Sequence, residues 1–173
     1  MTPRRLVLCL LLLAALSACG FQLRGSRPDS RLPFTTLYLE VARNTPLERD
    51  LRSTILAQDG IKLMSDAKSA QATVRIVSEK EEKKILTLNA QGQVREYSLL
   101  YRISYEVKEA DGTVLLKPTE LALQAFMSYS EAQALAKETE QKMIFSDLRS
   151  DAINQMVRQM AQLKPTQQVS KPD

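Results

Sequence analysis

The residue with the clearest chemical role in this sequence is Cys19, which ends the run Leu16-Ser17-Ala18-Cys19. Arg4 and Arg5 precede a short apolar stretch, and small side chains lie just before the cysteine, as in a bacterial lipoprotein signal peptide. Cleavage before Cys19 would leave its thiol bonded to a diacylglycerol and its new amino group acylated. The alternative is an ordinary cleaved signal peptide followed by a chance cysteine. The apolar stretch is too short to span a bilayer, which takes about 20 helical residues.

A lipid-modified Cys19 predicts attachment to a membrane by fatty chains. One acyl chain binds a membrane only reversibly, whereas two or more, at about 0.8 kcal/mol for each buried CH2, hold a protein there stably. Gly20, rather than an aspartate, follows the cysteine, and this favours the outer membrane of a Gram-negative bacterium. We therefore expect a signal peptide over residues 1–18, a lipid-anchored tether over 19–34, a single folded domain over 35–164 and a disordered tail over 165–173.

The composition excludes most classes of enzyme. The sequence contains no histidine, so it lacks His-assisted serine or cysteine nucleophiles and the commonest ligand of zinc and other transition metals. We expect no cofactor other than the covalent lipid on Cys19. A periplasmic hydrolase that uses two carboxylates stays open as an alternative. The acidic residues, however, lie in mixed-charge runs such as 78–84, which are typical of solvated surfaces.

The net charge argues against nucleic acid as a partner. The sequence has 24 Lys and Arg against 20 Asp and Glu, and loss of Arg4 and Arg5 with the signal peptide leaves a net charge of +2. Such a small charge creates no strong overall field, so any anionic partner must meet a local basic patch. Cys9 would leave with the signal peptide and Cys19 would carry lipid, so no cysteine remains for a disulfide.

Hydrophobic periodicity predicts four strands and two helices in the mature chain. Alternating apolar residues predict strands over 37–41, 73–88, 97–107 and 114–129. Thr45, Pro46 and Glu48 are the residue types of a helix N-terminus, and Gly60 is suited to the end of that helix. Helical spacing predicts a second, longer helix over 130–163. The order β-α-β-β-β-α favours an α+β fold, a two-layer sandwich in which both helices cover one face of a four-stranded, mainly antiparallel sheet.

Turn residues separate the last three strands. Asn89-Ala90-Gln91-Gly92 and Asp111-Gly112 both have the composition of tight turns between antiparallel neighbours. Pro118 lies inside the last strand and lacks the N–H that a sheet ladder uses. We therefore expect a bulge or an edge position at Pro118.

Two segments resemble the LptE family of lipopolysaccharide-assembly lipoproteins, once called rare lipoprotein B. They are Cys19–Gly25 (CGFQLRG), which joins the lipidation motif to a fixed following sequence, and Ala134–Ile144 (ALAKETEQKMI) in the second helix. The order of strands and helices is similar as well, and the resemblance covers about residues 19–163. It implies a non-enzymatic protein that lies as a plug inside the outer-membrane barrel LptD, in a 1:1 complex. It also implies help in assembling that barrel and contact with lipopolysaccharide.

Lipopolysaccharide carries phosphates, so direct contact calls for lysine or arginine side chains that form charge-assisted hydrogen bonds. The candidates are Lys137, at the ALAK position of the family motif, and Arg95, just beyond the Gly92 turn. Each also has a plainer interpretation as a solvated surface charge. Some relatives carry a basic residue where this chain has Ala90, and Lys83 and Lys84 could compensate, although Glu81 and Glu82 precede them.

The sequence leaves one other class of binding protein open. A pilotin or scaffold lipoprotein of another envelope or secretion complex would share the anchor and the α+β body but would not bind lipopolysaccharide. The pore protein that co-purifies with the detergent-extracted chain distinguishes the two. Whether contact with lipopolysaccharide is direct, and which surface meets the barrel, also stay open at the level of sequence.

Overall fold

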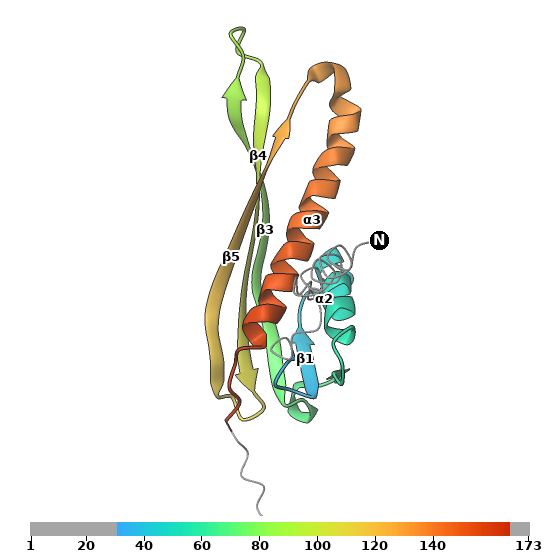
Figure 1. Cartoon of the computed structure of the whole chain (residues 1–173), viewed down its shortest axis with the longest axis vertical. Coiled ribbons are helices and arrows are strands. Elements are labelled where there is room, and N and C mark those ends of the chain that lie inside the picture. Colours follow the sequence, from blue (N-terminus) through green and yellow to red (C-terminus); the bar gives the residue numbers. More distant parts are fainter. Residues whose placement is uncertain (1–30, 167–173) are drawn as a thin grey trace, which may run out of the picture.

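The computed structural model describes residues 31–166, in which five strands form one sheet beside two α-helices (Figure 1). The predicted signal peptide, Cys19 and most of the predicted tether and tail lie outside the described residues. The elements in chain order are β1 (Thr36–Glu40), α2 (Pro46–Leu56), β2 (Lys62–Leu63), β3 (Ala72–Leu88), β4 (Val94–Glu109), β5 (Val114–Ser128) and α3 (Ala134–Met160). Short 3-10 turns, Ala67–Ser69 and Glu131–Gln133, precede β3 and α3.

The start of α2 has the capping residues that the sequence predicts. Thr45 Oγ1 accepts a hydrogen bond from the N–H of Glu48 at 3.1 Å, and Glu48 Oε2 accepts one from the N–H of Asn44 at 2.6 Å. These bonds satisfy amide groups that the helix itself cannot pair. The prediction for the end of α2 is wrong in detail, because the helix ends at Leu56, before the left-handed Gly60 (φ 79°) of the following turn.

The sheet differs from the predicted four-stranded, mainly antiparallel arrangement. Its order is β2-β1-β3-β4-β5, and β1 is parallel to both of its neighbours, β2 and β3. The connection through α2 returns the chain in the same direction, as parallel pairing requires. The strand β2 has only two residues, too few to produce an alternation that could be recognised in the sequence. The antiparallel meander β3-β4-β5 confirms the remaining prediction.

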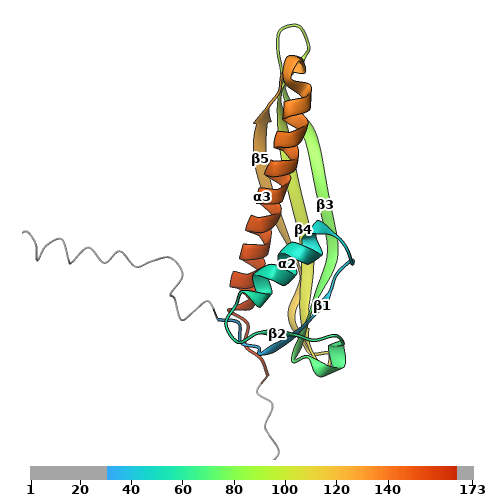
Figure 2. The same ribbon diagram turned by 90° about the vertical axis from the view of Figure 1, so that its right-hand side faces the viewer.

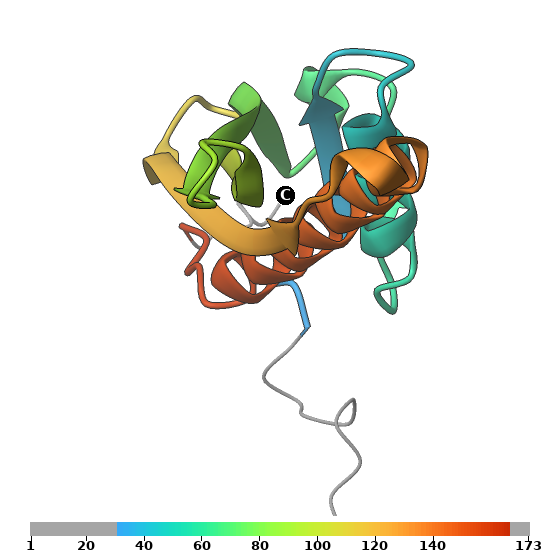
Figure 3. The ribbon, with the colours of Figure 1, turned by 90° about the horizontal axis from the view of Figure 1, so that it is seen from above.

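Both helices lie beside the sheet (Figure 3), and both contribute side chains to one hydrophobic core. Apolar residues of α2 and α3 pack with alternate residues of the sheet, among them Tyr101 and Tyr105, which have no exposed surface. The hydroxyl of Tyr105 donates a hydrogen bond to Gln159 Oε1 at 2.5 Å, and burial raises the pKa of Tyr105 to about 12. The helical contributions to this core are Leu47, Leu51 and Ile55 from α2 and Phe145, Leu148, Ala152, Ile153, Met156, Val157 and Met160 from α3.

The position of Pro118 combines both of the predicted possibilities. The strand β5 forms an edge of the sheet. Tyr105 pairs with Thr119 and Val107 pairs with Leu116, so β5 has one more residue than β4 over this interval. The missing N–H of Pro118 therefore falls in a bulge on an edge strand, where the ladder loses little. Among residues 31–166, no helix is both long and apolar enough to cross a membrane.

Candidate functional site

One end of the molecule gathers the β3–β4 hairpin, the last residues of β5 and the first turns of α3; we call it the distal end, residues 83–97 and 126–143 (Figure 1). The hairpin turn is held by Asn89, whose Oδ1 accepts hydrogen bonds from the N–H groups of Gln91 at 3.0 Å and Gln93 at 2.9 Å. Gly92 has a φ of 76°, a conformation that suits glycine. The sequence therefore builds a defined turn at the distal end.

Arg95 lies in a bulge immediately after this turn. Thr87 pairs with Glu96 and Leu88 pairs with Val94, so Arg95 has no partner directly opposite on β3. A bulge changes the direction of the local strand and its side chains. Exposed Arg95 lines a pocket of about 370 Å³ together with Thr87, Leu88, Glu96 and Ser128.

Lys137 lies in the first turn of α3 and reaches across to the end of β5. Its Nζ donates hydrogen bonds to Ser128 Oγ at 3.0 Å and to Glu140 Oε2 at 2.8 Å, and its side chain is only 13% exposed. A freely solvated lysine would be far more exposed. Ser128 contacts Lys137 and also lines the pocket of Arg95. The structure thus brings the two predicted basic residues to the same strand end, from segments 42 positions apart in the sequence.

A third cation of the distal end is Lys83. Its Nζ lies 4.0 Å from the centroid of the Tyr97 ring and 5.8 Å from that of Tyr129, and the two rings meet edge to face at 5.1 Å. Lys84, by contrast, pairs with Glu82 at 3.0 Å. Lys83 pairs in register with Leu99 of the core face, so it points to the opposite face from Lys84. The sequence does show that Lys83 and Lys84, as adjacent residues of a strand, lie on opposite faces of the sheet. Which of the two lies on the core face follows only from the register between β3 and β4.

Large apolar side chains are also exposed at the distal end. Leu135, at the start of α3, is 83% exposed, and Met143 lies two turns further along the same helix. Exposed apolar side chains gathered at one end of a molecule, unlike single residues scattered over its surface, indicate a surface that meets another molecule. The exposed apolar residues of the distal end are Ile85, Leu86, Leu88, Phe126, Leu135 and Met143. Cations beside apolar surface suit a ligand that is anionic at one end and apolar at the other.

A charged cluster between the helices and β3 positions α3. Arg149 Nε donates to Asp50 Oδ2 of α2 at 2.8 Å, and its Nη1 lies 3.5 Å from Glu81 Oε1 of β3. The Arg149 side chain is only 11% exposed. Burial raises the pKa of Glu81, and the Arg149 charge opposes that rise. The guanidinium therefore joins three elements, and through α3 it helps to place Lys137.

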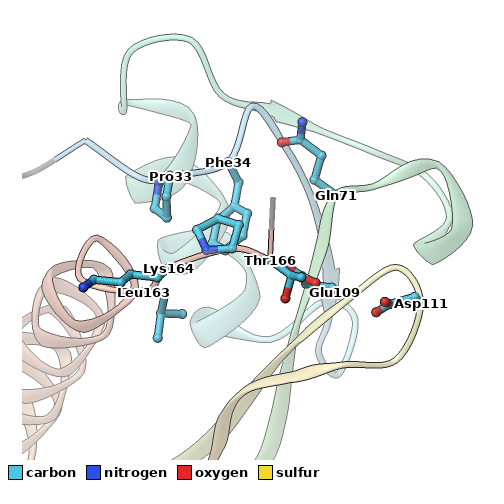
Figure 4. Close-up of a pocket in the computed structure, with 9 residues that line it drawn as sticks. Pro33, Phe34, Gln71, Glu109, Asp111, Leu163, Lys164 and Thr166 are labelled. Carbon is cyan, nitrogen blue, oxygen red and sulfur yellow. The ribbon is translucent and has the colours of Figure 1, made fainter. Parts of the chain in front are cut away.

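A pocket of about 810 Å³ lies at the opposite end of the fold, between the segment before β1 and the segment after α3 (Figure 4). Two carboxylates, Glu109 and Asp111, line it. Glu109 Oε1 accepts a hydrogen bond from the N–H of Thr166 at 2.7 Å, and Asp111 Oδ1 accepts one from the N–H of Thr113 at 2.8 Å. The latter bond lowers the pKa of Asp111, whereas a carboxylic acid that donates a proton in glycoside hydrolysis needs a raised pKa.

Both carboxylates of this pocket are therefore main-chain acceptors that hold neighbouring segments in place. Asp111 belongs to the β4–β5 turn, and Glu109 holds the segment that follows α3. Within residues 31–166, no group of three or more cysteine, aspartate or glutamate side chains is placed to hold a metal ion.

Comparison with known proteins agrees with the fold and with the order of elements. The chain is 26% identical over 161 residues to the LPS-assembly lipoprotein LptE of Photorhabdus laumondii subsp. laumondii, covering 90% of this chain and 85% of that protein. It is 28% identical over 163 residues to the protein of the same name from Pectobacterium atrosepticum, covering 88% and 82%. The solution structure of lipoprotein B from Nitrosomonas europaea has a TM-score of 0.69 at 33% identity, covering 82% of this chain and 90% of that one.

A protein family also matches this chain over most of the described fold. The family described as LptE, lipopolysaccharide-assembly, matches residues 34–160, from two residues before β1 to the last residue of α3. The match includes the strand ends and the helix start that carry Arg95 and Lys137. This chain therefore belongs to the LptE family of lipopolysaccharide-assembly proteins.

Proposed function

We propose that this protein is an outer-membrane lipoprotein, anchored through lipid on Cys19, that plugs the LptD barrel and assists the insertion of lipopolysaccharide. The observation that carries the proposal is the distal end, where Lys137 and Arg95 flank Ser128 beside exposed apolar side chains. This arrangement occurs in a chain of the LptE family. The protein acts by binding and has no turnover of its own.

The chemistry of the distal end suits lipopolysaccharide in two respects. The phosphates of lipopolysaccharide can accept charge-assisted hydrogen bonds from Arg95, which is exposed, and from Lys137. Its acyl chains can cover exposed apolar side chains such as Leu135 and Met143. Because Glu140 already accepts a hydrogen bond from Lys137 Nζ at 2.8 Å, a phosphate would compete with that carboxylate. Arg95 is the more accessible first contact, and Lys137 engages as the phosphate approaches Ser128.

A role inside a barrel is consistent with the outer face of the sheet. The lumen of a large outer-membrane barrel is polar, and the outer face carries ion pairs such as Arg102–Glu82 and Lys108–Glu106. A lipid-anchored tether would hold this body beside its barrel at a high effective concentration. We propose that one copy of the chain occupies one LptD barrel.

Photocrosslinking in living cells tests the two parts of this proposal separately. A photoreactive amino acid is placed at Leu135 in the full-length chain, and adducts to lipopolysaccharide and to LptD are scored independently. The substitution Lys137→Glu should reduce the lipopolysaccharide adduct by about tenfold, because a charge-assisted hydrogen bond contributes about 1.5–3 kcal/mol. The LptD adduct should stay unchanged. Arg95→Glu should act in the same direction.

Arg158→Glu is the matched control, because Arg158 is an exposed cation of the same helix that lies outside the distal end. It changes the net charge by the same amount as Lys137→Glu and should leave both adducts unchanged. Lipopolysaccharide adducts at the wild-type level in all three variants would contradict the assignment of Lys137 and Arg95 to lipopolysaccharide binding. Recovery of a secretin instead of LptD with the extracted protein would contradict the barrel partner and favour a pilotin.

A further inference from the structure

The strand β5 presents a long open edge of the sheet. Within residues 31–166, its only strand neighbour is β4, and the sheet ends there (Figure 2). The opposite edge is β2, which has only two residues. An open edge carries unpaired main-chain N–H and C=O groups that can pair with another extended chain. The fold therefore offers one substantial edge, fifteen residues long.

The pairing pattern identifies the residues whose main-chain groups face outward. The N–H of Tyr129 donates to the carbonyl of Arg95 at 2.7 Å, and from Ser128 to Leu121 the register to β4 continues without a shift. In an antiparallel pair, residues that bond to the neighbour alternate with residues that do not. The even-numbered residues Ala122, Gln124 and Phe126 therefore direct their N–H and C=O groups away from β4. Their side chains are exposed.

The two halves of this edge are protected very differently. The first half contains Lys117, Pro118 and Glu120 as well as the bulge. Charge, proline and bulges are the devices by which natural sheets prevent pairing at an edge. The second half, Leu121–Ser128 (LALQAFMS), contains no charge, no proline, no glycine and no register shift, in a chain in which 25% of residues are charged. Only the half next to the distal end is open to strand addition.

We propose that Leu121–Ser128 binds an extended segment of the LptD partner, which adds to the sheet beside β5. This inference rests on the proposed function. The segment must lie outside the closed barrel wall, because strands of the wall already pair on both edges. Opposite Ala122 and Gln124 it carries uncharged residues. Toward Glu120, at the other end of this half, it carries a basic residue, which sets its direction.

A proline substitution tests the main-chain part of the contact. Ala122→Pro removes one outward N–H and leaves the bonds to β4 in place, because proline is tolerated where the N–H faces away from the ladder. Ala122→Ser keeps the N–H and serves as the matched control. Both variants are made in the full-length, tagged chain in cells, and the amount of LptD that co-purifies is measured. We expect at least a fivefold loss with proline, because a main-chain hydrogen bond to the added strand is lost, and no loss with serine.

The outcomes separate this inference from the proposed function. If the wild-type chain recovers no LptD, both are wrong. If wild type and Ala122→Pro recover equal amounts, only the added strand is wrong. Equal losses with proline and serine would assign the contact to side-chain packing and overturn main-chain pairing. Circular dichroism and thermal unfolding show whether each variant folds. If the Ala122→Pro variant does not fold, a crosslink from Gln124→Cys tests the edge instead.

A cysteine at the same edge identifies the occupant directly. Gln124→Cys places a thiol among the outward-facing residues, and Gln124→Ala shows what loss of the Gln124–Ser98 hydrogen bond (2.8 Å) does by itself. A crosslink from Cys to LptD, mapped to an extended uncharged segment, supports the inference. A crosslink between two copies of this chain, or none to LptD while LptD still co-purifies, overturns it.

Discussion

The two ends of this molecule differ in how far their apolar residues are buried, and β3 runs through both ends. At its start, Ala72 and Val74 have no exposed surface, whereas Ile85 near its end is 58% exposed. The first end has β1, β2 and α2 beside it, and the distal end has only β4, β5 and the start of α3 (Figures 1 and 2). The difference comes from coverage, since both ends carry apolar residues.

This comparison teaches that the stabilising core and the proposed binding surface lie at opposite ends of the long axis. Burial of α2 residues against β3 and α3 supplies the hydrophobic free energy that holds the fold. The distal end adds little burial but presents cations and apolar side chains together. The proposed binding surface can stay exposed there because the core at the other end maintains the fold.

The largest expected effect comes from comparing a buried leucine of α2 with an exposed leucine of the distal end. Leu51 of α2 has no exposed surface, so Leu51→Ala should lower the free energy of unfolding by about 2–5 kcal/mol through lost burial and a residual cavity. Leu135→Ala, the same change at the distal end, should stay within about 0.5 kcal/mol. Urea unfolding of both variants measures the contrast. Similar losses would mean that Leu135 is buried in the folded protein and that the comparison is wrong.

An intermediate effect is expected where the two ends are joined. Arg149→Met removes the hydrogen bond to Asp50 and the ion pair to Glu81, and should cost about 1–3 kcal/mol. Arg158→Met is the matched control, because Arg158 is an exposed arginine of the same helix. Arg149→Met should also reduce the lipopolysaccharide adduct if the position of α3 determines that of Lys137. An unchanged adduct in a destabilised variant would show that the distal end is placed independently.

The smallest expected effect is a pH dependence with opposite signs at two glutamates. Hydrogen bonding to Lys108 and the charge of Arg75 lower the pKa of Glu106, so its contribution to stability is present above its usual pKa near 4.5 and is lost as pH falls. Glu106→Gln should therefore lower the melting temperature at pH 7, and the difference should shrink toward pH 3.

For Glu81 the sign is reversed. Burial raises its pKa, so its stabilising contribution is present below the usual pKa near 4.5 and is lost as pH rises through the raised value. Glu81→Gln should leave the melting temperature at pH 7 unchanged or higher. Melting curves between pH 3 and 7 check both variants. A loss at pH 7 for Glu81→Gln would show that its pairing with Arg149 outweighs the cost of burial.

Much of the fold could be predicted from local signals. The cap at Thr45, the strand that begins near Thr73, the bulge at Pro118 and the long final helix all depend on neighbouring residues, and the structure confirms them. The parallel pairing of β1 could not be predicted in the same way. It depends on β2, whose two residues carry no periodicity, and on contacts between segments far apart in the sequence.

The candidate site shows the same division. Lys137 is a candidate because the family motif contains it, and Arg95 is one because it follows the Gly92 turn. That both lie next to Ser128, however, depends on how α3 packs beside β5. In the sequence alone, the acidic neighbours Glu81 and Glu82 argue against a ligand role for Lys83. The register with β4 places it instead over Tyr97, away from Lys84 and its partner Glu82.

The sequence by itself determined the lipidation motif, the periodicity of each long element and the residues that start and end them, because these depend on interactions within a few residues. Only the tertiary structure decided which strand edge stays open, which apolar residues stay exposed and which cations share one strand end. These features depend on register and coverage between distant segments, and a local pattern carries no information about which segment will lie opposite.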